Sequence, residues 1–227
     1  MTGITLAVLD MAGTTVTDGG LVDGAFLDAL VAVGIGADDP DNDQRIRYVH
    51  DTMGQSKITV FRHLLDDETR AQAALAGFEA SIRRRIDDGE VAALPGAAEA
   101  IGTLRERGVK VCLTTGFTAE TQQRIIERLG WQQLIDAALA PGPGVRGRPA
   151  PDLVLAAMLR LAIDDVRQVA VVGDTTSDLW CGHHAGAGIV AGVLTGAHDR
   201  ATLTGAPHTH IIDSVADLAD VVDRHEI

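Results

Sequence analysis

Short apolar runs alternate along this chain with longer segments in which apolar positions recur every three or four residues. Four of the runs have the length of buried strands: residues 4–9, 109–113, 169–172 and 188–190. A fifth run, 210–212, predicts an additional edge strand. Segments of helical length lie between the runs: 97–107, 119–129, 151–161 and 177–184. This alternation predicts an α/β fold, a Rossmann-like doubly wound parallel sheet with helices on both faces.

One long segment breaks the alternation. From about residue 21 to residue 91 the pattern is helical throughout, and it predicts helices at 25–33, 43–65 and 68–88. Two short stretches bracket this segment, Asp-Gly-Gly at 18–20 and Leu-Pro-Gly at 94–96. We therefore expect two domains. Residues 1–17 and 95–227 would form the α/β core, and residues 18–94 would form an all-helical insert, called the insert below.

Composition excludes several classes of protein. The 227 residues carry a net charge of −13 and give a pI near 4.9, which argues against a protein that binds nucleic acid or an anionic membrane. No apolar run is long enough to span a bilayer, and the first residues do not resemble a signal peptide. Cys112 and Cys181 lie in apolar contexts, so we expect unpaired thiols and a cytoplasmic protein. Aromatic residues make up only 3% of the chain, which leaves aromatic cages poorly supplied.

Polar residues follow several of the predicted strands. In open parallel sheets, ligands bind beyond the carboxyl ends of the strands. The residues found there, or just before a helix, are Asp10, Thr114, Thr115, Arg148, Asp174 and Asp178. Carboxylate oxygens hold Mg²⁺, and a carboxylate can attack phosphorus to form an aspartyl-phosphate. Arg148 and Thr115 would offset the charge of a phosphoryl group, and Gly13 and Gly116 would let backbone N–H groups approach it.

Four short motifs carry a family resemblance. DMAGTT (10–15), LTTG (113–116), GRPAP (147–151) and GDTTSD (173–178) resemble, in order and spacing, the motifs of the haloacid dehalogenase superfamily. The resemblance implies that Asp10 is the nucleophile, Thr115 the phosphate-binding hydroxyl and Arg148 the cation of the third motif. It also implies that the insert is the superfamily's mobile cap.

The same resemblance implies a Mg²⁺ site. Asp10, Asp174 and the backbone carbonyl of Ala12 would bind the metal directly, and Asp178 would act indirectly or through water. An alternative interpretation of Asp174 and Asp178 is a helix-capping pair. Phosphatases of the superfamily usually carry an aspartate at the position of Ala12, which protonates the leaving oxygen. A carbon leaving group that is stabilised elsewhere would not need this acid.

A motif in the insert narrows the resemblance. Together with DMAGTT, TTGFT and GRPAP, the run Met53-Gly54-Gln55-Ser56-Lys57 resembles the phosphonoacetaldehyde hydrolases (phosphonatases) and their phosphonatase-like relatives. That family cleaves a C–P bond through a Schiff base formed by the lysine of a Met-Gly-x-x-Lys motif. The resemblance implies that Lys57 is this amine, with Met53 and Gly54 at the substrate. The alternative is an exposed helical lysine.

The lysine content sharpens this assignment. The chain has 17 arginines but only two lysines, Lys57 and Lys110, and a guanidinium cannot act as an amine nucleophile. For Lys57 to react near pH 7 its pKa must fall, through burial or a neighbouring positive charge.

Two departures from the phosphonatase pattern point to a different substrate. The family's proton-shuttling histidine, three residues after the lysine, is replaced by Val60. His50 lies about 20° from Lys57 around an ideal helix and is the candidate replacement. The tyrosine after Thr-Thr-Gly is Phe117, which is expected beside the substrate. We therefore expect a phosphonatase-like enzyme for another 2-oxo phosphonate.

Three hypotheses remain open at this stage. The first is Mg²⁺-dependent cleavage of the C–P bond of a 2-oxoalkyl phosphonate. The second is a phosphatase for small phosphate monoesters, or a phosphomutase, of the same superfamily. The third is a non-catalytic phosphoryl-binding domain. A small-molecule substrate is expected in the first two, and apolar residues of the insert suggest a homodimer formed through the cap.

Overall fold

The strands of the protein form one parallel sheet. The computed structural model describes residues 3–17 and 20–225. Within these ranges the strand order is β3-β2-β1-β4-β5-β6, and every neighbouring pair is parallel. The strands are β1 (Leu6–Asp10), β2 (Lys110–Thr114), β3 (Ala137–Leu139), β4 (Val169–Gly173), β5 (Ile189–Val193) and β6 (His210–Ile212). The central strands are buried on both faces, as their continuous apolar runs predict.

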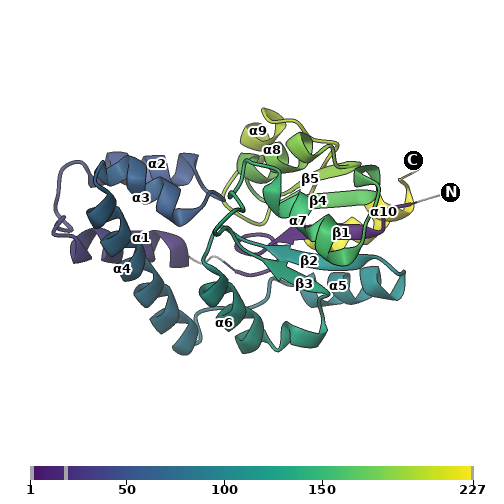
Figure 1. Cartoon of the computed structure of the whole chain (residues 1–227), viewed down its shortest axis with the longest axis horizontal. Coiled ribbons are helices and arrows are strands. Elements are labelled where there is room, and N and C mark those ends of the chain that lie inside the picture. The colour runs from purple at the N-terminus through teal and green to yellow at the C-terminus, as the bar shows by residue number, and fades with distance from the viewer. Residues whose placement is uncertain (1–2, 18–19, 226–227) are drawn as a thin grey trace.

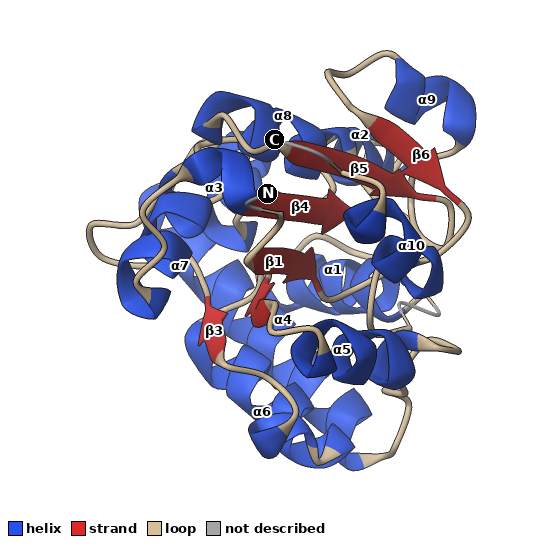
Figure 2. Cartoon of the chain, turned by 90° about the vertical axis from the view of Figure 1, so that its right-hand side faces the viewer, coloured by secondary structure: helices blue, strands red, loops and turns tan. Residues whose placement is uncertain are grey.

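Helices cover both faces of this sheet (Figures 1 and 2). Alternate side chains of β1 enter two different hydrophobic clusters: Ala7 and Leu9 enter one, Leu6 and Val8 the other. The first cluster is completed by α5 (Ala97–Glu106), α6 (Ala119–Leu129) and α10 (Leu218–Asp223). The second is completed by α7 (Asp152–Leu161) and α8 (Thr176–Ala185). The short helix α9 (Arg200–Thr204) packs near β6. The doubly wound α/β fold is therefore confirmed.

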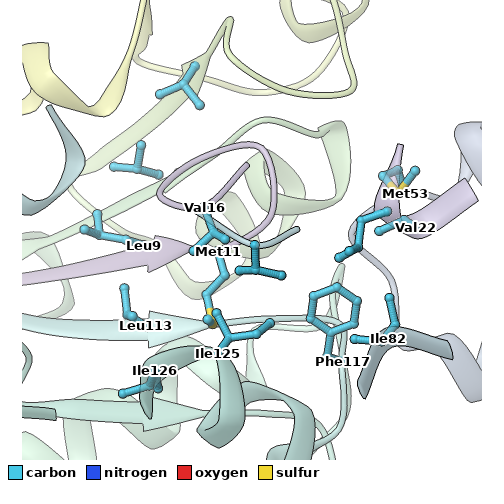
Figure 3. Packing of buried hydrophobic residues seen from close by; sticks show 14 of the residues in the cluster. Leu9, Met11, Val16, Val22, Met53, Ile82, Leu113, Phe117, Ile125 and Ile126 are labelled. Atoms are coloured by element: carbon cyan, nitrogen blue, oxygen red, sulfur yellow. The ribbon is translucent and has the colours of Figure 1, made fainter. Parts of the chain in front are cut away.

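Four helices between β1 and α5 form a separate group (Figure 1). They are α1 (Leu21–Ala32), α2 (Asn42–Asp51), α3 (Lys57–Leu65) and α4 (Glu68–Asp87). Hydrophobic packing continues from the sheet into this group. Figure 3 shows part of it, with Phe117 drawn between Ile125 of the core and Ile82 of the insert. Within the described residues the insert is therefore all-helical, as predicted. The domain boundaries at 1–17, 18–94 and 95–227 stay a prediction.

The single helix predicted over 43–65 is wrong. The chain leaves the helical conformation between α2 and α3, where Gly54 adopts a φ of 83°. This left-handed conformation favours glycine because other residues meet a steric penalty there. The first of the two stretches predicted to bracket the insert includes residues 18 and 19, which lie outside the described residues. Gly96, with a φ of 78°, caps the start of α5.

Other sequence predictions hold with shifts of a few residues at their ends. The strand predicted at 210–212 is confirmed, whereas β3, α9 and α10 were missed. Cys112 and Cys181 are buried and unpaired, as expected, and burial raises the pKa of each thiol to about 12. Within the described ranges, no helix has both the length and the apolar character that crossing a bilayer requires.

Candidate active site

Residues from four core segments and from the insert enclose one small cavity. Its free volume is about 20 Å³, enough for one water molecule. The core contributes residues at or after the ends of β1, β2 and β4 and before α7: Asp10, Ala12, Thr115, Gly116, Phe117, Arg148, Asp174 and Thr175. The insert contributes Val22, Met53, Gly54 and Lys57. The structure therefore brings together most of the residues that the motifs predicted.

A buried guanidinium lies at the centre of this arrangement. Nη1 of Arg148 lies 2.5 Å from Oδ1 of Asp10 and also pairs with Oδ1 of Asp178. Although burial opposes a charge, these two carboxylates raise the pKa of Arg148 above its ordinary value, so the side chain stays cationic. Its Nε and Nη2 atoms are buried and donate no hydrogen bond within the described structure. Two buried, unused donors fit the oxygens of a phosphoryl group.

The carboxylates of Asp10 and Asp174 carry negative charge that the protein does not fully compensate. Burial raises the pKa of Asp10 to about 7; Arg148 opposes this shift and Asp178 adds to it. Burial, Asp10 and Asp178 raise the pKa of Asp174 as well. Asp174 accepts a hydrogen bond from the backbone N–H of Ala197 (2.7 Å), but in the described part of the chain no cation pairs with it. This excess of buried oxygen donors and negative charge fits a divalent cation.

Asp178 has a structural role in addition to its contact with Arg148. Its Oδ2 accepts hydrogen bonds from the backbone N–H (3.1 Å) and the hydroxyl (2.5 Å) of Thr175, which completes a capping box at the start of α8. Both oxygens are therefore engaged by the protein. Among the described residues, no three His, Cys, Asp or Glu side chains are grouped as metal ligands. The assignment of Asp10, Ala12, Asp174 and Asp178 to a metal thus stays a prediction.

Glycines allow the loops around the cavity to approach one another closely. A Cβ atom at Gly13 would collide with the carboxylate of Asp174, and one at Gly116 with the backbone carbonyl of Gln55. The hydroxyl of Thr115 accepts the N–H of Phe117 at 3.1 Å, which fixes the turn that follows β2. Glycine is therefore needed at both positions because any side chain would clash with a neighbouring loop, in addition to any contact that these residues make with a ligand.

The turn between α2 and α3 seats the insert on the core. A Cβ at Gly54 would lie 2.5 Å from Oγ1 of Thr175, and the backbone N–H of Lys57 donates to the carbonyl of Gly116 at 3.3 Å. Lys57 is the first residue of α3 and is only 5% exposed. The alternative of an exposed lysine is therefore wrong. The Met-Gly-x-x-Lys run is a tight turn followed by a helix start, which delivers Lys57 to the cavity.

Three predicted site residues do not line the cavity: Gly13 and Asp178, which lie against its lining residues, and His50, which lies away from them. The side chain of His50 is exposed, and its Nε2 lies 2.9 Å from Oδ2 of Asp23. Its predicted place beside Lys57 depended on one continuous helix. Because the helix breaks at Gly54, the two side chains do not share a face, and the prediction for His50 is wrong.

Sequence reasoning missed the loop that follows β5. The hydroxyl of Thr195 donates to the carbonyl of Gly13 at 2.6 Å, and Ala197 donates to Asp174. The sequence did contain a signal for this loop, because the loop follows a strand and ligands bind beyond the carboxyl ends of parallel strands. The strand predicted at 188–190 ended three residues before the observed end of β5 at Val193.

Comparisons with known proteins identify relatives of this chain. A phosphonoacetaldehyde hydrolase of Bordetella pertussis is 34% identical over 153 residues, which cover 57% of this chain and 55% of that protein. The chain thus spans about half the length of such curated relatives. The probable phosphatase IndB of Dickeya dadantii is 28% identical over 218 residues, covering 94% of this chain and 91% of the relative.

Solved structures share the fold over nearly the whole chain. A hydrolase from Pseudomonas syringae gives a TM-score of 0.84 at 22% identity, covering 98% of this chain and 100% of the other. A phosphonoacetaldehyde hydrolase-like protein from Oleispira antarctica gives 0.82 at 23% identity, covering 97% and 92%. The family model of the haloacid dehalogenase-like hydrolases matches residues 4–186. With the parallel sheet, the four motifs and this match in place, the chain belongs to the haloacid dehalogenase-like hydrolases.

Proposed function

We propose that this protein is a Mg²⁺-dependent hydrolase that cleaves the C–P bond of a 2-oxoalkyl phosphonate. The observation that carries the proposal is the small cavity in which Lys57 of the insert shares its lining with Asp10 and Arg148 of the core. A carboxylate nucleophile, a phosphate-binding cation and a buried primary amine are the three groups that this reaction requires. The likeness to phosphonoacetaldehyde hydrolases over part of the chain supports the same chemistry.

In the first half of the proposed reaction, the neutral amine of Lys57 adds to the carbonyl carbon of the substrate. Uptake of one proton and loss of one water molecule then give an iminium ion two bonds from phosphorus. A carboxylate oxygen of Asp10 then attacks phosphorus, and the electrons of the P–C bond flow into the iminium to form an enamine. Ala12 fits this route because the leaving group is a carbon that the iminium stabilises, and no acid is needed at that position.

In the second half, the enamine carbon takes up a proton, and water hydrolyses the resulting imine to release the aldehyde or ketone and regenerate Lys57. A further water hydrolyses the aspartyl-phosphate, which releases phosphate and regenerates Asp10. The unused Nε and Nη2 donors of Arg148 would hold the phosphoryl oxygens throughout. Mg²⁺, held by Asp10, Asp174 and the carbonyl of Ala12, would offset the charge of the phosphoryl group.

A panel of 2-oxoalkyl phosphonates, scored by release of phosphate, tests this proposal. We expect Mg²⁺-dependent turnover by the wild type and by Lys110→Arg, which is the matched control for loss of a lysine. Lys57→Ala and Lys57→Arg should each lose at least about 10³-fold in kcat, because neither can form the imine. An active Lys57→Arg enzyme would contradict the proposal.

A second candidate is hydrolysis of a small phosphate monoester. The specific observation in its favour is the match to the probable phosphatase IndB, which covers almost the whole of both chains. Ala12 argues against it, since an alkoxide leaving group would lack its proton donor. Turnover of sugar phosphates without turnover of any phosphonate would favour this candidate, with Lys57 then serving only to bind substrate.

A further inference from the structure

All four phenylalanines of the chain form one cluster, and three of them lie around the amine of Lys57. The rings of Phe26 and Phe61 are 4.8 Å apart, those of Phe26 and Phe78 5.0 Å, and those of Phe78 and Phe117 6.1 Å, measured between centroids. The expectation from composition, that aromatic cages are poorly supplied, was therefore wrong. Aromatic residues are few, but the fold gathers every phenylalanine at one place.

Three of these rings face the amine. Nζ of Lys57 lies 5.6 Å from the ring centroid of Phe26, 5.6 Å from that of Phe117 and 6.0 Å from that of Phe78. These distances are within the range of cation–π attraction. The rings come from α1, from α4 and from the loop after β2, so that both the insert and the core contribute. Each of the three is at most 3% exposed. We call Phe26, Phe78 and Phe117 the phenylalanine shell.

We propose that the phenylalanine shell is a set of positioning residues that favours the iminium form of Lys57 over its hydrated ammonium form. The inference rests on the proposed function, in which the imine is the first intermediate. A primary ammonium is a compact and strongly hydrated charge, and buried rings keep water away from it. An iminium spreads its positive charge over nitrogen and carbon, needs less hydration and keeps the attraction of the ring faces.

Formation of the iminium conserves both atoms and charge. An ammonium and a carbonyl compound give an iminium and one molecule of water, with one positive charge on each side. The shell therefore acts on a reaction that conserves charge, by making the surroundings less suitable for the hydrated cation than for the delocalised one. The water that is formed has to leave the shell, which further favours the product.

Phe61 provides a matched control within the same cluster. It is fully buried and packs against Phe26 and Phe78, yet in the described structure its ring is not among those facing Nζ. Phe61→Leu should weaken packing as much as Phe26→Leu or Phe78→Leu does. Only the latter two remove a ring face from the amine.

Imine formation can be measured without any phosphonate. The full-length protein is treated with acetaldehyde and cyanoborohydride, and ethylation of Lys57 is measured relative to Lys110 by peptide mass spectrometry. Lys110 is an exposed internal standard whose Nζ donates to the carbonyl of Leu161 at 2.6 Å. Because acetaldehyde contains no phosphorus, this readout is independent of whether the protein cleaves a C–P bond.

We expect the ratio of Lys57 to Lys110 ethylation to fall roughly 3- to 10-fold in Phe26→Leu and Phe78→Leu. In Phe61→Leu it should stay within about twofold of wild type. Phe117→Tyr keeps a ring face and should keep the wild-type ratio of Lys57 to Lys110 ethylation, whereas Phe117→Leu should lower this ratio. A role in packing alone predicts the reverse order for these two, because the tyrosine adds a buried hydroxyl. An unchanged or higher ratio in Phe26→Leu and Phe78→Leu, or an equal fall in Phe61→Leu, would overturn the proposal.

Discussion

The core and the insert contribute opposite environments to one small cavity. On the core side, Asp10, Arg148 and Asp178 are charged groups that hold one another through ion pairs. On the insert side, the amine of Lys57 faces two rings of the insert, Phe26 and Phe78, and one ring of the core, Phe117. The two sides of the cavity are built by different means. Charges on the core side are fixed by loops at strand ends and before α7, whereas the amine is surrounded by rings from two helices of the insert and from the loop after β2.

The largest effect is expected on the core side, from Asp10→Asn. The amide cannot attack phosphorus, so kcat should fall by at least about 10³-fold. Burial already raises the pKa of Asp10, so removing its charge should not reduce the free energy of unfolding in metal-free buffer. Phosphate release and urea unfolding measure the two effects. A variant that loses activity only because it unfolds would contradict this view of the core side.

An intermediate effect is expected where the two sides meet, at Gly54. Gly54→Ala should destabilise the protein by about 2 kcal/mol, because alanine is strained at a φ of 83° and its Cβ would approach Thr175. Gly34→Ala is the matched control: Gly34 has a φ of 82°, but a Cβ added there would meet no heavy atom within 4 Å, so only the backbone cost of about 1 kcal/mol remains. Equal losses in urea unfolding would show that the insert does not sit closely on the core.

The smallest effect concerns pH and Asp174. Without metal, raised pKa values mean that the folded protein holds protons that the unfolded chain releases above about pH 4. Folding then takes up protons, so the free energy of unfolding falls as the pH rises from about 4 to about 7. Asp174→Asn removes one buried charge and keeps an oxygen that can accept the N–H of Ala197.

We therefore expect Asp174→Asn to be more stable than wild type by about 1 kcal/mol at pH 8 in EDTA, with no difference below pH 4. Added Mg²⁺ should reverse the order, because it stabilises only the protein that retains the carboxylate. Urea unfolding at the two pH values makes this measurement. A less stable variant at pH 8 in EDTA would argue against uncompensated negative charge on the core side.

The sequence was most informative where local chemistry and strand ends define the site. Asp10, Thr115 and Asp174 were found because they occur in short motifs at the carboxyl ends of strands, and parallel strands bring those ends together. Arg148 was found from a motif just before a helix. Lys57 was found from a motif alone. For the core residues, the groups that fix the side chain are close in sequence or share one sheet edge.

The remaining features depend on packing between segments distant in sequence. No periodicity places Phe26, Phe78 and Phe117 around one amine, because they belong to three different elements. His50 was misplaced because one glycine with positive φ breaks a helix whose apolar pattern continues through it. β3, with the sequence Ala-Ala-Leu, lacks the β-branched residues that identify a strand, and only its pairing with β2 defines it.

The most direct test of the account is borohydride trapping with a 2-oxoalkyl phosphonate, followed by peptide mass spectrometry. The chain offers only two lysines, so the result has few possible outcomes. We expect a reduced adduct on Lys57 and none on Lys110, and no adduct in Lys57→Arg. Absence of an adduct on Lys57 in an enzyme that releases phosphate from the same compound would contradict the Schiff-base chemistry.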